Sequence, residues 1–152
     1  MSKIAIEQLL TVVEQTNPED HYDRFEQAWE AISDEPLLVS NPQGPRYHPR
    51  RTDGERYRAA IDAEAYESAA MILMWPFERI KLGSYRWELT NSGYLDGVHL
   101  GRPSATIHHP LSSGGGPMVT ASFPTPGMAM LIAALRAHAE WGHEIQGGIA
   151  QK

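Results

Sequence analysis

Cysteine is absent from the 152 residues of this chain. Disulfide bonds, thiolate metal ligands and cysteine nucleophiles are therefore excluded, and the composition fits a reducing compartment. The first 16 residues lack the basic start and the continuous apolar run of a signal peptide, because Glu7 and Gln8 interrupt the apolar pattern. No segment approaches the ~20 apolar residues that cross a bilayer. We therefore expect a cytoplasmic protein without a membrane partner.

The sequence also lacks the short motifs of common enzyme classes: G-x-S-x-G, H-E-x-x-H and G-x-G-x-x-G. Two adjacent histidines, His108 and His109, would point to opposite faces of a strand and could not share one ion. A zinc site needs three or four converging ligands, which His99, His138 or His143 would have to supply. We therefore expect no catalytic activity, no cofactor and no bound metal.

Charge is distributed unevenly, although the formal net charge is only −6. Residues 1–35 contain nine acids against two basic residues, whereas residues 45–58 contain five arginines against two acids. An acidic protein repels nucleic acid at long range, so direct nucleic-acid binding is not expected. Arginine and tyrosine are frequent anchors of interfaces. The predicted partner-binding residues are Arg46, Tyr47, Arg50, Arg51, Arg56, Arg58, Glu19, Asp20 and Asp23. The alternative is a solvated loop whose arginines pair with the acidic segment.

Helical spacing of apolar residues predicts two helices in residues 1–35. The first ends near Thr16, and the second follows the capping sequence Asn17-Pro18 and stops at Pro36. Together they form an N-terminal helical hairpin that is appended to the rest of the chain. Residues 36–56, rich in proline and arginine, form an arm. The apolar stripes of the two helices are Ile6, Leu9, Leu10 and Val13, and Tyr22, Phe25, Trp29 and Ile32.

The rest of the chain predicts an α+β core over residues 57–142 and a frayed tail over 143–152. Residues 55–74 form one alanine-rich helix that ends before Pro76. Alternating residues predict antiparallel strands at 80–90, 104–109 and 118–123, with a turn at 91–97.

The last helix of this core begins at Thr125-Pro126. It is apolar nearly all round, so the sheet and another element cover it, or a second copy does, as in a homodimer. We expect a sheet of three or four strands between the alanine-rich helix and the terminal helix.

The segment 112–117, SSGGGP, could bind an anion through backbone N–H groups. A phosphate-binding P-loop would end in lysine and a hydroxyl residue at the start of a helix, whereas here Pro117 and a strand follow. A flexible hairpin loop is therefore the favoured interpretation. Together with the arginine-rich arm, the loop supports an alternative function, a small-ligand or nucleotide-binding (sponge) protein.

The second half of the chain contains a recognisable series of segments. An alanine-rich helix with Ala69-Ala70 is followed by a strand with Trp87, a further strand at 105–109, and a closing helix over 125–137 that a threonine-proline pair introduces. Residues 62–140 thereby resemble uncharacterised accessory proteins of bacteriophages and prophages, of the phage ABA-sandwich type. The resemblance implies a sandwich of helices and strands, and it carries over no catalytic motif.

Composition and resemblance together predict a small accessory protein of phage or mobile-element origin, acting by stoichiometric binding in the cytoplasm of a host cell. The expected partner is a host or defence-system protein, or a nucleoprotein complex, as for a defence inhibitor of the anti-CRISPR type. The separated charges and the lack of a catalytic signature support this hypothesis. Two alternatives stay open: the small-ligand binder, and a metal-dependent hydrolase that uses the histidines.

Overall fold

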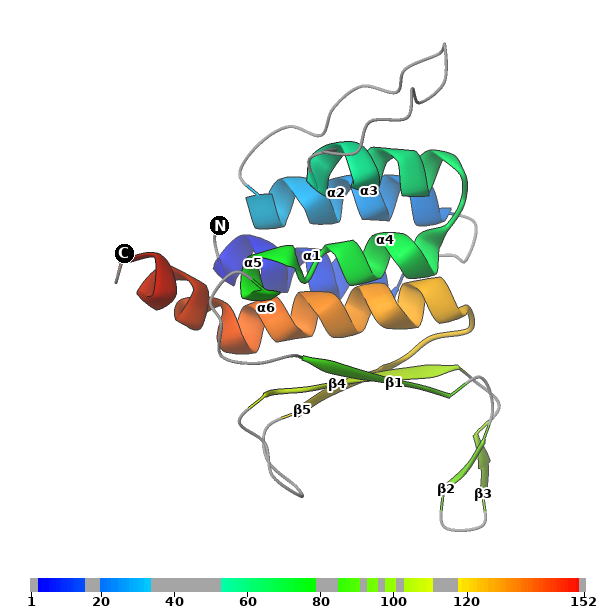
Figure 1. The fold of residues 1–152 in the computed structure, drawn as a ribbon. Helices are drawn as coiled ribbons and strands as arrows, with labels where there is room; N and C mark the ends of the chain where they lie inside the picture. The colour runs from blue at the N-terminus through cyan, green and yellow to red at the C-terminus, as the bar shows by residue number, and fades with distance from the viewer. Residues whose placement is uncertain are drawn as a thin grey trace.

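The computed structural model describes residues 3–15, 20–33, 53–78, 85–90, 93–95, 98–100, 103–110 and 118–150. This part of the chain has the α+β fold that the sequence predicts (Figure 1). None of its helices is both long and apolar enough to cross a bilayer. The elements are α1 (Lys3–Glu14), α2 (His21–Ser33), α3 (Asp53–Asp62), α4 (Tyr66–Ile72), α5 (Trp75–Glu78), β1 (Arg86–Thr90), β2 (Gly93–Leu95), β3 (Val98–Leu100), β4 (Ser104–His108), β5 (Met118–Ser122) and α6 (Pro126–Ala150).

Strands β1, β4 and β5 form an antiparallel sheet in the order β1-β4-β5, as the alternating pattern predicts. Trp87 lies opposite Ile107, which in turn lies opposite Val119, so these apolar side chains share one face of the sheet. Strands β2 and β3 form a separate antiparallel pair. The prediction of a turn over 91–97 is therefore wrong for residues 93–95. Leu95 pairs with Val98.

Helix α6 lies at the centre of the fold (Figure 1). It packs on β4 and β5 on one side and on α1 and α4 on the other, with α2 and α3 farther from the sheet. The prediction that the sheet lies between two helical layers is wrong, because the described helices all lie on the same side of it. An apolar helix needs cover on more than one side, and here one chain supplies it. Its buried residues are Met128, Ala129, Met130, Leu131, Ile132, Ala133, Ala134, Leu135, Ala137 and Trp141. The apolar surface that suggested a homodimer through this helix is thus covered within the chain.

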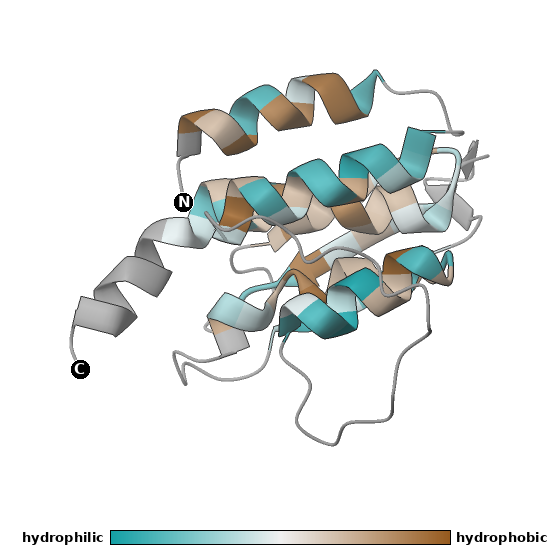
Figure 2. Ribbon diagram, turned by 90° about the horizontal axis from the view of Figure 1, so that it is seen from above, coloured by the Kyte–Doolittle hydropathy of each residue, from teal (hydrophilic) through white to brown (hydrophobic). Residues whose placement is uncertain are grey.

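Helices α1 and α2 belong to the same hydrophobic core as the rest of the molecule. Ile6 and Val13 from α1 are fully buried, as is Phe25 from α2, and both helices contact α6. Hydrophobic and hydrophilic residues alternate along the outer helices, as amphipathic helices require (Figure 2). The two helices contact each other as expected. They are nevertheless part of the helical layer and not an appended hairpin.

The alanine-rich segment 55–74 is not one helix but two, α3 and α4, because α3 ends at Asp62. Glu64 has a φ of 58°, in the left-handed region. The N–H of Ala65 donates to the carbonyl oxygen of Ala60 at 2.8 Å, and that of Glu64 to Ile61 at 3.1 Å. These two bonds define a Schellman C-cap with Glu64 at the position that glycine usually occupies. The sequence does not indicate that α3 ends here, since glutamate is a good helix former.

Further along, Pro76 lies inside the short helix α5 and does not end a longer one. Proline is tolerated there because the first turn of a helix needs no intrahelical N–H donor.

The terminal helix begins at Pro126, as predicted, but runs to Ala150, so the tail expected at 143–152 is helical through most of its length. The glycines there lower helix propensity by only about 1 kcal/mol each. Gly127 has a specific packing role. A Cβ at this position would lie 2.7 Å from the Cβ of Tyr66, so glycine permits the close approach of α6 and α4.

Replacing Glu64 by glycine should stabilise the protein by about 0.5–1 kcal/mol, because glycine adopts the left-handed conformation without the penalty of a Cβ atom. Urea unfolding of the E64G variant measures the change. The E64A variant is the control: it retains the Cβ and should show no comparable gain. Equal or lower stability of E64G relative to the wild type would contradict the assigned C-cap.

Candidate interaction surface

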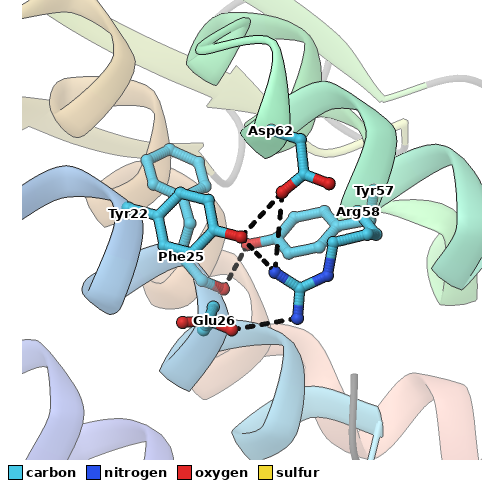
Figure 3. Close-up of polar contacts among 6 residues, drawn as sticks. All are labelled: Tyr22, Phe25, Glu26, Tyr57, Arg58 and Asp62. Carbon is cyan, nitrogen blue, oxygen red and sulfur yellow. Dashed lines mark hydrogen bonds and ion pairs between the residues drawn. The ribbon is translucent and has the colours of Figure 1, made fainter. Parts of the chain in front are cut away.

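A polar network joins α2 to α3 at the outer side of the helical layer (Figure 3). Arg58 of α3 donates through Nη2 to Glu26 Oε2 at 2.9 Å and through Nη1 to the hydroxyl oxygen of Tyr22, both on α2. The Tyr22 hydroxyl in turn donates to Asp62 Oδ1 at 2.7 Å. The guanidinium also lies 3.7 Å from Asp62 Oδ1 and 5.7 Å from the centre of the Tyr22 ring. Arg58 therefore has partners on both helices.

Arg58 keeps its charge in this network. Its side chain is only 11% exposed, and burial alone would lower its pKa. The hydrogen bond that Arg58 donates to Glu26 and its electrostatic interactions with Tyr22, Glu26 and Asp62 outweigh burial, so the pKa of Arg58 is raised above its ordinary value. A planar guanidinium can serve two carboxylates and a hydroxyl at once, which a lysine ammonium cannot do in the same geometry.

Beneath the charged groups, aromatic side chains hold the same two helices together. The hydroxyl of Tyr57, the residue before Arg58 on α3, donates to the backbone carbonyl oxygen of Phe25. Burial raises the pKa of Tyr57 well above 10.0, so this hydroxyl remains a donor. The Tyr57 ring also packs 5.1 Å from that of Trp29 and 6.3 Å from that of Phe25, centroid to centroid. The α2–α3 contact therefore has an apolar base and a charged rim.

The outward side of α2 is acidic. Asp20, just before the helix, and Asp23, Gln27 and Glu30 within it recur at helical spacing and are exposed, whereas Phe25, Ala28, Trp29 and Ile32 are buried. Asp23 and Glu30 are about two turns, or ~10 Å, apart. Since α2 is bound to α3 by Arg58 and Tyr57, these carboxylates lie on a fixed helix. We call Asp20, Asp23, Gln27 and Glu30 the acidic face of α2.

The structure separates the sequence-predicted site residues into three groups. Arg46, Tyr47, Arg50, Arg51 and Glu19 lie outside the described residues. Asp20 and Asp23 are exposed on the acidic face. The two remaining residues, Arg56 and Arg58, differ sharply from each other.

Arg56 is 56% exposed and lies 3.4 Å from Asp53 on its own helix, whereas Arg58 is 11% exposed and makes the pairs with Glu26 and Asp62 described above. Arg58 thus pairs with the acidic segment, as the alternative interpretation predicts, although it lies on a helix and not in a solvated loop. Sequence reasoning missed Glu26 and Asp62 as its partners. The four-residue spacing of Arg58 and Asp62 on one helix was the available signal.

The adjacent histidines point to opposite faces of the sheet, as predicted. His108 Nε2 lies 3.2 Å from Glu88 Oε1 on the outer face. His109 is buried on the inner face, where its ring packs 5.4 Å from Tyr85 and 5.1 Å from Trp141. Among the residues that the structure describes, no three His, Asp or Glu side chains converge in a way that could hold a metal ion. His99, His143 and the glycine loop lie outside the described side chains.

His138 lies in the interior, between α6 and α4. Its Nε2 is 2.7 Å from the carbonyl oxygen of Leu73, which can only accept, so Nε2 carries the proton. Nδ1 is buried without a partner within the described structure. Burial lowers the pKa of His138 to about 4, although the bond to Leu73 favours the charged form. The imidazole is therefore a neutral donor that satisfies a carbonyl at the end of α4.

No known protein family, curated protein or solved structure shows detectable similarity to this chain.

The two arginines of α3 provide a matched test of the network. The R58M variant keeps most of the apolar stem but loses the guanidinium, which should destabilise the protein by about 2 kcal/mol. This figure allows for water screening at Glu26 and Asp62, each about one-third exposed. The R56M variant removes an exposed pair and should change the stability by less than about 0.5 kcal/mol. Equal effects of R58M and R56M in urea unfolding would contradict the assigned network.

His138 should make stability fall in mild acid. The unfolded chain takes up a proton near pKa 6.5, whereas the folded protein does so only near 4. The contribution of neutral His138 to the unfolding free energy is therefore intact above pH 6.5 and is lost as the pH falls toward 4. Between about pH 7.5 and about pH 5 the loss is about 2 kcal/mol. The H138Q variant keeps a donor for Leu73 but cannot titrate, so its unfolding free energy should depend less on pH by that amount. An unchanged pH dependence would refute this assignment.

Proposed function

We propose that this protein acts by stoichiometric binding to another macromolecule, and that the acidic face of α2 is part of its binding surface. The observation that carries the proposal is that exposed carboxylates stand on a helix that Arg58 and Tyr57 bind to its neighbour. A surface that is ordered before binding loses less conformational entropy on association than a mobile one. The acidic face of α2 meets this condition.

The charge of the acidic face defines the partner that it fits. Carboxylates at fixed positions attract a basic surface, speed association and disfavour acidic partners. Basic surfaces of this kind are typical of proteins that bind nucleic acid. We therefore propose a nucleic-acid-binding host protein or nucleoprotein complex as the partner, with α2 occupying positions that phosphates otherwise take. A cytoplasmic inhibitor of a host defence system, of the anti-CRISPR type, is the specific form of this proposal. That setting rests on the order of segments over residues 62–140 alone, because the comparisons with known proteins detect no family.

Charge reversal on α2, compared with charge reversal elsewhere, tests the proposal. The tagged wild-type protein should recover a basic protein or complex from a bacterial host lysate in about equimolar amount. The D23K/E30K variant should recover at least about tenfold less, because four units of charge change on the acidic face. The control E7K/E140K changes the net charge equally, at exposed positions on α1 and α6, and should bind as the wild type does.

Melting curves must show that both variants stay folded, since Asp23 also lies in the first turn of α2. Recovery of the same partner by D23K/E30K would show that the acidic face is not the binding surface. Recovery of no partner in comparable amount by the wild-type protein would contradict stoichiometric binding itself.

A further inference from the structure

The two edge strands of the three-stranded sheet, β5 and β1, differ in the side-chain contacts that their backbones make. On β5, Arg136 of α6 donates to the backbone carbonyl oxygen of Thr120, and it is held there by Glu14 of α1 at 2.6 Å. A charged side chain across an edge strand hinders a further strand from pairing with it. Strand β1 forms the opposite edge, and its described ladder runs only to β4. No described side chain makes an equivalent contact with the backbone of β1.

Strand β1 also extends the apolar face of the sheet beyond its main helical cover. Helix α6 packs chiefly on β4 and β5. Trp87 is only partly buried, and Leu89, which points to the same side, is 53% exposed. The alternating pattern predicts that Tyr85, Trp87 and Leu89 all face the core, so the exposure of Leu89 departs from the pattern. A strand added next to β1 would cover both side chains.

The charged side chains of β1 in one copy can pair with the opposite charges of β1 in a second copy. Arg86 and Glu88 lie on the outer face, two residues apart, with side chains 69% and 60% exposed. Antiparallel pairing about a two-fold axis at Trp87 places Arg86 opposite the partner's Glu88, and Glu88 opposite the partner's Arg86. The same register brings Leu89 opposite the partner's Tyr85 and pairs the two tryptophans on the inner face.

The neighbouring symmetric registers lack this complementarity. An axis at Glu88 sets Glu88 against the partner's Glu88, and an axis at Arg86 sets two arginines against each other. Like charges in directly opposed positions are unfavourable. The sequence Arg86-Trp87-Glu88 therefore favours one register over both of its neighbours.

We propose that two copies of this chain associate through β1, in antiparallel register centred on Trp87, and join their three-stranded sheets into one sheet of six strands. This interface is distinct from the acidic face of α2, so it does not depend on the proposed function. It is small, because each strand contributes about five residues, and small interfaces form weak, transient complexes. Association should therefore appear as the protein concentration rises.

Complementary charge swaps test both the interface and its register. The E88R variant presents two arginines on β1, and the R86E variant presents two glutamates. Each variant alone faces like charges across the axis, so its dimer dissociation constant should rise at least about tenfold relative to the wild type. An equimolar mixture should form a heterodimer about as stable as the wild-type dimer, since every opposed pair is then Arg–Glu. The double swap R86E/E88R should likewise dimerise.

Sedimentation velocity over a wide concentration range measures these equilibria. The controls R56E and E67R make the same charge changes at exposed positions on α3 and α4, and should dimerise as the wild type does. Because Arg86 and Glu88 are largely exposed, circular dichroism and melting curves should be unchanged in the swapped variants. A wild-type protein that stays monomeric would overturn the proposal. So would single variants that dimerise like the wild type, or a mixture that forms no heterodimer.

Discussion

Helix α6 must be buried on two sides, and the rest of the architecture follows from this requirement. Its residues from Met128 to Leu135 are all buried, so neither one sheet nor one helix could cover it alone. The sheet covers one side, and α1 and α4 cover the other. Gly127 permits the close approach of α6 to α4. Arg136, which is partly exposed, bridges Glu14 and the edge strand β5. Burying this many aliphatic side chains is the main source of stability in such a fold.

The same requirement explains where polar chemistry can reside. Polar groups near α6 must be satisfied locally, as His138 satisfies the carbonyl oxygen of Leu73, or they must lie farther out. The α2–α3 layer is one step removed from the sheet, and charged side chains reappear there. Arg58 can remain ionised because Glu26, Tyr22 and Asp62 surround it. The acidic face of α2 lies beyond that network, on a helix whose inner side is anchored by Phe25 and Trp29.

Local features of the fold could be predicted from the sequence, whereas its layering could not. Thr125-Pro126 marks the start of α6, and short alternating runs mark β4 and β5, because capping and strand periodicity are local properties. The end of α3 could not be predicted from Glu64, since glutamate favours helix and its left-handed conformation is seen only in the structure, together with the C-cap hydrogen bonds of Glu64 and Ala65. The apolar residues all round α6 predicted that the helix is buried on two sides. They did not predict which elements would pack against it.

In the candidate site, too, some features could be predicted from the sequence and others could not. The exposure of Asp20 and Asp23 could be predicted from helical periodicity. The pairing of Arg58 with Glu26 joins residues 32 apart in the chain, and depends on how two helices dock. Helical periodicity gives the face of a side chain but not the element that will meet it. The arginines of α3 therefore looked equivalent in the sequence, although one is a structural ion-pair centre and the other is exposed.

Native-state hydrogen exchange of α6 tests most directly whether a single chain buries its central helix, and is measured on the R86E variant at several concentrations at which that variant is monomeric. Amides between Met128 and Trp141 should exchange only through global unfolding, and their protection should not depend on protein concentration. Protection of α6 that rises with concentration, or that falls below the protection of α3, would mean that a second copy supplies the cover and would contradict the architecture described above.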